Sequence, residues 1–270
     1  MNILEEIIAN KRQEIETTGY FQTLEKKVEE LPHVGNEDHC CCEKFPNLGK
    51  PDFITALKSA PIGLIAEVKR QSPSAGLIRD PFDPAQIVRT YEAAGAQAIS
   101  CLMDRKYFGG GEEQWNAVRE ATSLPMLYKE FVIDPRQIFH AEALGASAVL
   151  LIAAALSDAE LKKYIRLTEA SGMTPLVEVH TEEEMKRAVD ANARCIGINN
   201  RNLKTFETTL ETTLTLCEQA PENCTLISES GIRTADDIRM LRESGISAVL
   251  VGESLLRRPD LGEAVKNLMN

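Results

Sequence analysis

Residues 134–152 read DPRQIFHAEALGASAVLLI, and this stretch contains the unit that decides the fold. Asp134 before Pro135 is a typical helix start, and Gly145 is a typical helix end. The apolar run Ala148–Ile152 that follows has the length of a buried strand. A helix, a capping glycine and a short apolar strand in this order are typical of parallel sheets built from alternating strands and helices.

The same junction recurs along the chain. Gly95-Ala-Gln-Ala-Ile and Gly245-Ile-Ser-Ala-Val match Gly145-Ala-Ser-Ala-Val, and Asn192 takes the place of the glycine before another apolar run. The repeat step of about 50 residues corresponds to two strand–helix units. We predict eight strands, alternating with helical segments such as Pro84–Ala94, Pro135–Leu144, Ala159–Ala170, Glu182–Asp190 and Thr234–Glu243. The strands are Leu64–Lys69, Ala98–Leu102, Met126–Phe131, Ala148–Ile152, Pro175–Val179, Cys195–Asn199, Thr225–Ser228 and Ala248–Val251.

Eight strand–helix units predict an α/β protein with the fold of a (β/α)8 TIM barrel. A doubly wound open sheet is the alternative, weakened because no G-x-G-x-x-G turn follows the first strand. In the first 50 residues, Ile3, Ile7 and Ile8 recur at helical spacing and predict an amphipathic helix of about 15 residues. We expect residues 1–50 to form an N-terminal helical extension and loop in the same domain as the barrel of residues 51–270.

Charge and composition exclude several partners. The chain has 41 acidic and 30 basic residues, a net charge of −11, and no basic run, so we expect no nucleic acid partner. No apolar stretch approaches the roughly 18 residues that span a bilayer, and the charged N-terminus is unlike a secretory signal, so we expect no membrane partner. Seven cysteines, an odd number, suit a reducing cytoplasm. We therefore expect a cytoplasmic protein that is a monomer or a weak homo-oligomer.

Histidine and cysteine residues do not indicate a metal site. His39-Cys40-Cys41-Cys42 has suitable ligand types, but adjacent residues reach one tetrahedral ion poorly and no C-x-x-C pair accompanies them. We interpret this segment as a variable loop and His180 as structural. Cys101 and Cys195 lie within apolar strands, which favours core residues over nucleophiles.

Charged and polar side chains stand where the predicted strands end, which is the end that carries the active site of a barrel. With the period of two of a strand, Glu67 and Lys69 share a face. The same reasoning gives Lys129, Glu178, Asn199, Arg201, Glu229 and Ser230 at the ends of four further strands. These side chains could form either an active-site pocket or a paired ion network that only closes the barrel mouth. Charges on five strands favour a pocket for acid–base chemistry, because lysines and glutamates in one pocket shift each other's pKa.

Glycine-containing turns follow the last two strands. Gly231 and Gly252 stand after the seventh and eighth strands, where backbone N–H groups and a short helix form the recurrent phosphate site of such barrels. Ser72-Pro-Ser74-Ala-Gly76 after the first strand is a hydroxyl-bearing loop that we expect to fold over a ligand. The sequence therefore predicts a small-molecule phosphorylated substrate.

The chain resembles the indole-3-glycerol phosphate synthase family over nearly its whole length. Glu130 departs from the usual Asp, Ala75 departs from a common Lys, and residues 36–50 match nothing in the family. The matching segments are Ile65-Ala-Glu-Val-Lys-Arg-Gln-Ser-Pro-Ser74, Lys129-Glu-Phe-Val-Ile-Asp134, Leu176-Val-Glu-Val-His180, Ile196-Gly-Ile-Asn-Asn-Arg-Asn-Leu203, Ser228-Glu-Ser-Gly-Ile232 and Val251-Gly-Glu253, together with Phe53-Ile-Thr-Ala-Leu57.

The resemblance implies a carboxy-lyase of tryptophan biosynthesis that uses no metal or organic cofactor. It would convert 1-(o-carboxyphenylamino)-1-deoxyribulose 5-phosphate to indole-3-glycerol phosphate, with loss of carbon dioxide and water. By similarity, the catalytic residues are Lys129, Lys69, Glu178, Glu67, Asn199, Glu229 and Ser230. The phosphate ligands by the same similarity are Ser72, Arg201, Gly231, Gly252 and Glu253, and the walls of the ring pocket are Phe108, Phe131 and Leu150. Sequence does not assign the two lysines to closure or dehydration; we favour Lys129 for closure.

Two alternative functions stay open at this point. One is another phosphate-binding barrel such as phosphoribosylanthranilate isomerase, whose Cys and Asp acid–base pair has no counterpart where the first strand ends in Glu67 and Lys69. The other is a non-catalytic barrel subunit, which has no need to hold Lys69, Lys129 and Glu178 together.

Overall fold

The computed structural model describes residues 3–24, 52–203 and 205–270. Within these residues, eight parallel strands form a closed barrel in the order β1-β10-β9-β8-β7-β6-β5-β4. The predicted TIM barrel is confirmed, and the closed strand order excludes the open doubly wound sheet. The barrel strands are β1 Gly63–Val68, β4 Ala98–Leu102, β5 Met126–Lys129, β6 Ala148–Ile152, β7 Thr174–Val179, β8 Cys195–Asn199, β9 Thr225–Glu229 and β10 Ala248–Val251.

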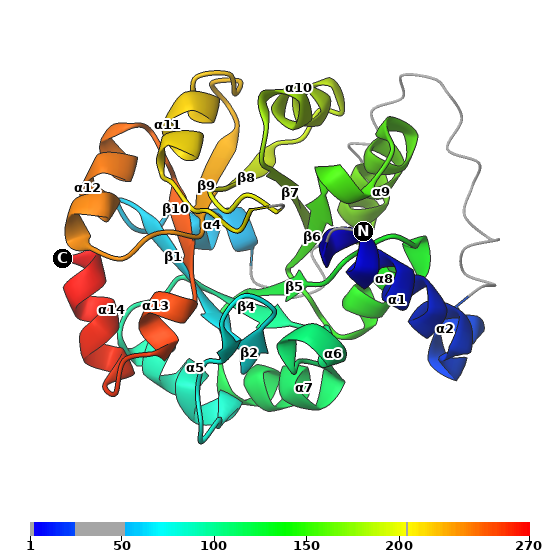
Figure 1. Cartoon of the computed structure of the whole chain (residues 1–270), viewed down its shortest axis with the longest axis horizontal. Helices are drawn as coiled ribbons and strands as arrows, with labels where there is room; N and C mark the ends of the chain where they lie inside the picture. The colour runs from blue at the N-terminus through cyan, green and yellow to red at the C-terminus, as the bar shows by residue number, and fades with distance from the viewer. Residues whose placement is uncertain (1–2, 25–51, 204) are drawn as a thin grey trace.

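Helices surround the strands and connect each one to the next (Figure 1). The connecting helices are α5 Pro84–Ala93, α7 Glu112–Ala121, α8 Pro135–Ala143, α9 Asp158–Ala170, α10 Glu182–Asp190, α11 Glu211–Cys217 and α12 Ala235–Glu243, and α14 Leu261–Met269 follows the last strand. The N-terminal helix is α1 Ile3–Thr17. Shorter elements are α2 Gly19–Thr23, α4 Phe53–Leu57, α6 Arg105–Phe108, α13 Glu253–Leu256, the 3-10 helix η1 Ala153–Ala155, and the two-stranded hairpin of β2 Gln71–Ser72 and β3 Gly76–Leu77.

The repeated helix–strand junctions have the backbone geometry that the sequence predicts. Gly95, Gly145 and Gly245 have φ angles of 96°, 72° and 82°, and Asn192 adopts 60° at the fourth junction. This left-handed conformation favours glycine or asparagine because the other residue types clash at Cβ. Each junction therefore ends its helix and turns the chain directly into the next strand.

The alternation of strand residues divides the core into two parts. In β1, Ile65 packs inside the barrel, whereas Leu64 and Ala66 pack outward against the helices. Phe53 and Leu57 of α4 join the interior group and close the barrel end opposite the pocket. The same alternation turns Glu67, Lys129, Glu178 and Glu229, near the carboxyl ends of four strands, toward the barrel axis.

Two strands end before the residue that the sequence predicts. β1 ends at Val68, where its pairing with β4 ends at Cys101, and β5 ends at Lys129 rather than Phe131. The loop Ser72–Gly76 is not wholly irregular, because Gln71–Ser72 pairs with Gly76–Leu77 in a small hairpin. These differences leave Lys69 and Phe131 in loops that border the barrel mouth.

The predicted N-terminal helix is α1, and it lies with α2 on the side of the barrel occupied by α8 (Figure 1). Ile3, Leu4 and Ile7 of α1 line the pocket at the barrel mouth. Residues 39–42 lie outside the described residues, and the division of the chain at residue 50 stays a prediction. Among the described residues, no helix combines the length and the apolar character needed to cross a membrane.

Candidate active site

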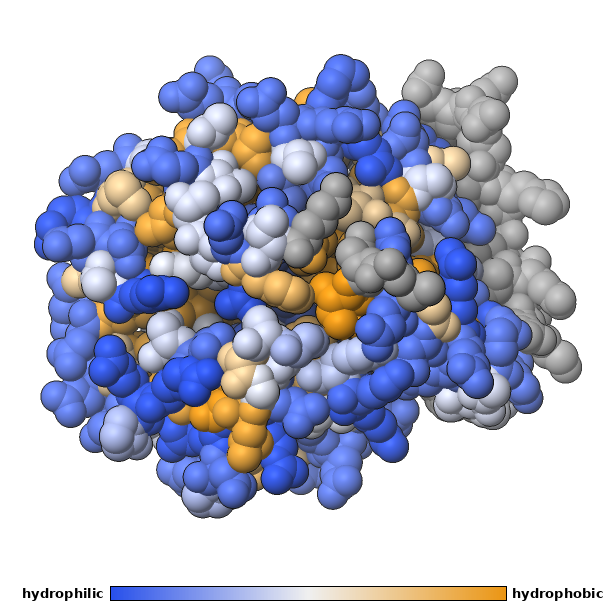
Figure 2. All heavy atoms as spheres, in the orientation of Figure 1, coloured by the Kyte–Doolittle hydropathy of each residue, from blue (hydrophilic) through white to orange (hydrophobic). Residues whose placement is uncertain are grey.

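A pocket of about 600 Å³ opens at the carboxyl ends of the barrel strands. This volume suits a small molecule, since ligand pockets typically measure about 300–1,000 Å³. Figure 2 shows hydrophobic residues at the centre of this face, with hydrophilic residues around them. The lining brings together every residue that the sequence analysis selected: Glu67, Lys69, Ser72, Phe108, Lys129, Phe131, Leu150, Glu178, Asn199, Arg201, Glu229, Ser230, Gly231, Gly252 and Glu253.

Lys129, at the end of β5, lies between two carboxylates from strands across the barrel. Its Nζ is 2.5 Å from Glu229 Oε2 and 3.4 Å from Glu178 Oε2, and its side chain is 13 % exposed. Burial opposes the charged form of Lys129, but Glu229, Glu178 and Glu67 together raise its pKa above the ordinary value. These carboxylates therefore favour the protonated ammonium form of Lys129 at the floor of the pocket.

Glu178, on β7, is ionised by its neighbours. Burial favours its neutral form, but Lys129, His180 and Asn199 outweigh that effect and lower its pKa. Asn199 on β8 also accepts a hydrogen bond from the backbone N–H of Arg201, at 3.1 Å from its Oδ1. The amide is thereby fixed next to the carboxylate.

Glu229, on β9, has a different environment although it contacts the same lysine. Burial raises its pKa to about 7, Lys129 opposes the rise, and Glu178 and Glu67 add to it. Its Oε1 is buried and has no hydrogen-bond partner among the described residues. Glu229 thus combines a pKa near neutrality with a free acceptor atom, two properties expected of a group that takes up or releases a proton.

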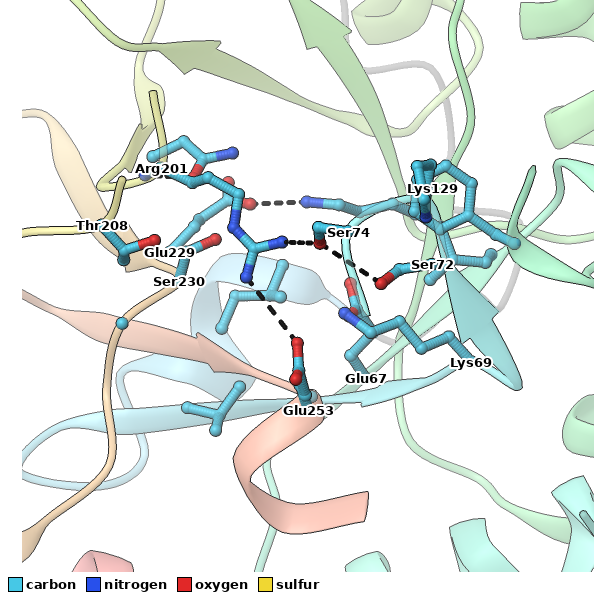
Figure 3. Close-up of a pocket in the computed structure, with 18 of the residues that line it drawn as sticks. Glu67, Lys69, Ser72, Ser74, Lys129, Arg201, Thr208, Glu229, Ser230 and Glu253 are labelled. Carbon is cyan, nitrogen blue, oxygen red and sulfur yellow. Dashed lines mark hydrogen bonds and ion pairs between the residues drawn. The ribbon is translucent and has the colours of Figure 1, made fainter. Parts of the chain in front are cut away.

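Lys69 and Glu67 form a second ion pair on the opposite side of the pocket (Figure 3). Glu67 is buried on β1, which favours its neutral form, but Lys69, Lys129 and Arg201 lower its pKa. The backbone at Gly252 passes so close to Glu67 that a Cβ atom there would overlap its carboxylate. The pocket therefore contains two lysine–carboxylate pairs on different walls.

Arg201 reaches across the mouth of the pocket from the loop after β8 (Figure 3). Its Nη1 donates to Ser74 Oγ at 2.6 Å, and its Nη2 lies 3.7 Å from Glu253 Oε2. Arg201 Nε is buried with no hydrogen-bond partner among the described residues. Ser230 and Gly231 nearby have φ angles of 65° and 81°, a turn that brings the backbone to the rim. A guanidinium with an unused donor, hydroxyl groups and exposed backbone are suitable ligands for a phosphate.

The three residues selected for the ring pocket come from separate elements. Phe108 ends α6, Phe131 follows β5, and their ring centroids lie 6.1 Å apart. Leu150 is buried inside the barrel on β6. Together they give one side of the pocket an apolar wall that fits a planar aromatic ring.

The sequence analysis missed Lys11 on α1, which is 1 % exposed. Its Nζ lies 3.0 Å from Glu130 Oε2 and 3.2 Å from Asp104 Oδ2, and it also binds Glu14. Burial raises the pKa of Glu130 to about 7, and Lys11 opposes that rise. Lys11 thus fixes α1 to the residue that follows Lys129. A signal was present, because Lys11 interrupts an apolar stripe of Ile7 and Ile15 at a spacing of four residues.

The backbone of Gly197 on β8 lies close to the carboxylate of Glu229, which makes the position of Glu229 testable. A Cβ atom at Gly197 would overlap Glu229 Oε1 and approach Leu176 Cδ1 to 3.3 Å. We expect Gly197→Ala to displace Glu229 from Lys129 and to lower kcat by about tenfold to a hundredfold. Gly19→Ala, at a glycine with open space around it, is the matched control and should leave kcat unchanged. Steady-state kinetics on both variants checks this, and an unaltered kcat for Gly197→Ala would show that the position of Glu229 is unimportant.

These features define the class: a (β/α)8 barrel with a pocket of paired lysines and carboxylates at the carboxyl ends of its strands. The family model described as indole-3-glycerol phosphate synthase matches residues 4–268. The chain therefore belongs to the indole-3-glycerol phosphate synthase family.

Curated relatives agree with this assignment, and a solved structure agrees with the fold. The indole-3-glycerol phosphate synthase of Acetivibrio thermocellus is 41 % identical and the alignment covers 98 % of each chain. The enzyme of the same name from Geobacillus kaustophilus is 42 % identical, with 98 % of this chain and 96 % of the relative covered. A solved 3-hexulose-6-phosphate synthase has a TM-score of 0.62 at 14 % identity, with 77 % of this chain and 98 % of that chain covered, and supports the fold alone.

Proposed function

We propose that the protein closes the indole ring: it converts 1-(o-carboxyphenylamino)-1-deoxyribulose 5-phosphate to indole-3-glycerol phosphate, with release of carbon dioxide and water. Membership of the family supports this carboxy-lyase activity. The observation that carries the residue roles is the position of Lys129 between Glu178 and Glu229 in a pocket that also holds Lys69 and Arg201.

Ring closure requires an acid at the ketone oxygen while the ring carbon attacks the carbonyl carbon. We assign this acid to Lys129, because its ammonium group is charged and faces the pocket. The substrate carboxylate, which leaves as carbon dioxide when the ring regains aromaticity, is assigned to Lys69. The apolar wall of Phe108, Phe131 and Leu150 would hold the ring in the orientation that the attack needs.

Dehydration then requires an acid for the leaving hydroxyl group and a base for the proton on nitrogen. We assign Glu178 to this step, with Glu67 and Asn199 orienting the lysines and the substrate hydroxyl groups. Glu229 and Ser230 line the same part of the pocket, and the pKa of Glu229 near 7 suits proton exchange at neutral pH.

The phosphate is assigned to Ser72, Arg201, Gly231, Gly252 and Glu253, the last two through backbone N–H groups. The carboxylate of Glu253 faces Arg201 and would repel the phosphate, so only the backbone of that residue can contribute. We expect Arg201→Ala and Ser72→Ala to raise KM by about tenfold or more with a smaller change in kcat, because phosphate binding is uniform between ground and transition states. Steady-state kinetics tests this, and an unchanged KM for both variants would contradict the phosphate assignment.

Three assays of the purified protein test the activity: indole formation, consumption of phosphoribosylanthranilate, and substrate binding without turnover. Ring closure produces the indole chromophore from the anilino-deoxyribulose phosphate. Phosphoribosylanthranilate isomerase activity would instead consume phosphoribosylanthranilate, and a non-catalytic barrel would bind a substrate without turning over either. We expect indole formation alone. A cytoplasmic location and a monomeric or weakly self-associating state stay predictions.

A further inference from the structure

His180 lies directly behind Glu178, in the first position after β7. Its Nε2 is 3.3 Å from Glu178 Oε1, and its Nδ1 is 3.1 Å from Glu184 Oε2. The imidazole side chain is 8 % exposed. One carboxylate therefore faces each ring nitrogen. The contact of Nδ1 with Glu184 is a hydrogen bond, whereas that of Nε2 with Glu178 is an ion-pair distance without hydrogen-bond geometry, and a doubly protonated ring is attracted to both carboxylates.

The local sequence explains how Glu184 comes to hold this ring. Thr181 and Glu184 have the spacing of a capping box, as Ser157 and Glu160 do at the start of α9. In α9, Glu160 Oε2 returns to the backbone N–H of Ser157 at 2.8 Å and completes the box. In α10, Glu184 Oε2 instead accepts from the backbone N–H of His180 at 2.7 Å and also faces its ring.

The charges around His180 favour an imidazolium ion. Burial would lower its pKa, but Glu178 and Glu184 raise it to about 10. The same contact stabilises the ionised form of Glu178. From the other elements, Lys129 on β5 and Asn199 on β8 face Glu178, so the carboxylate is held from three sides.

We propose that His180 is a positioning residue for the reaction: an imidazolium, held by Glu184, that keeps the carboxylate of Glu178 turned toward Lys129. This inference rests on the proposed function of Glu178. It replaces the interpretation of His180 as merely structural. The strand alternation did not predict this contact, because β7 ends at Val179 and the ring turns back from the loop.

The consequence is an alkaline dependence of turnover. His180 is charged below a pKa of about 10 and loses its charge as the pH rises through that value. We expect kcat of the wild type to fall in that range, with Lys129 still protonated because its pKa is higher. Glu184→Gln removes one of the two carboxylates, so the pKa of His180 should fall by about one unit or more and the alkaline limb should move to lower pH.

The kinetic experiment compares His180→Gln and Glu184→Gln with Glu160→Gln, which removes the matched capping carboxylate of α9 away from the pocket. For His180→Gln we expect kcat to fall by about tenfold to a hundredfold with little change in KM, the size seen when a residue that orients a functional group is lost. Glu160→Gln should retain the wild-type pH profile. Unaltered kcat for His180→Gln, or an alkaline limb that Glu184→Gln leaves in place, would overturn the proposal.

A measurement that needs no substrate separates this inference from the proposed activity. In protein labelled with ¹⁵N-histidine, His180 is assigned by the signal that His180→Gln removes. At pH 8 we expect both ring nitrogens of His180 to be protonated, and a neutral ring would overturn the inference even in an active enzyme. Absence of indole formation by the wild type would instead contradict the proposed function. If His180→Gln fails to fold, Glu184→Gln tests the proposal instead. Its alkaline limb and the deprotonation of the His180 ring should both move to lower pH, and no movement of either would overturn the proposal.

Discussion

Replacing Lys129 with alanine should lower kcat by about 10²–10⁴-fold while the protein stays folded, the loss typical of one positioned general acid. The ammonium group contacts both Glu178 and Glu229, and it projects into the pocket rather than the core. Alanine removes the proton donor for the ketone oxygen. It also leaves Glu178 and Glu229 without their shared cation, so both carboxylates would titrate at higher pH.

Steady-state kinetics with the anilino-deoxyribulose phosphate measures this effect, and circular dichroism verifies the fold. Lys186→Ala is the matched control: Lys186 pairs with Asp190 on the exposed face of α10, and its loss should leave kcat unchanged. A folded Lys129→Ala variant with a kcat close to the wild type would remove Lys129 from the mechanism.

Replacing Lys11 with methionine should lower the free energy of unfolding by about 3–5 kcal/mol, the cost of breaking a buried ion pair by removing one partner. Methionine fills a similar volume but leaves Glu130 and Asp104 buried without their cation. Asp104 also caps α6, which ends in Phe108, by accepting from the backbone N–H of Tyr107 at 2.7 Å. The loss should therefore loosen both α1 and the apolar wall of the pocket.

Urea unfolding of wild type, Lys11→Met, Glu130→Gln and the double variant measures this coupling. We expect the double variant to regain part of the stability that Lys11→Met loses, because a neutral amide at position 130 no longer needs a cation. A loss below about 1 kcal/mol for Lys11→Met, the size of a surface ion pair, would contradict the buried tether.

The candidate site was accessible from the sequence wherever a strand fixes the direction of a side chain. The period of two placed Glu67 and Glu178 on defined faces of their strands, and the end of the seventh predicted strand gave Glu229. The junctions at Gly95, Gly145, Asn192 and Gly245 predicted where β4, β6, β8 and β10 begin. All fifteen selected residues line one pocket. Their chemical roles stay predictions, since position alone does not assign a proton transfer.

What the sequence did not reveal depends on contacts between distant segments or on loops. Lys11 meets Glu130 across 119 positions of the chain, and helical spacing marks Lys11 as unusual without naming its partner. The ring of His180 turns back onto Glu178 because Glu184 binds His180 instead of completing a capping box with Thr181. The residue types at positions 181 and 184 do not distinguish these two arrangements. The reach of Arg201 to Ser74 likewise depends on how two loops fold over the barrel mouth.

The most direct test of the account is the stoichiometry of the reaction with substrate labelled with ¹³C at the carboxylate. The account predicts that the wild-type protein forms one labelled carbon dioxide for each indole chromophore, and that Lys129→Ala forms both at a rate about 10²–10⁴-fold lower. Turnover of the substrate without carbon dioxide, or indole formation by Lys129→Ala at a rate close to that of the wild type, would contradict it.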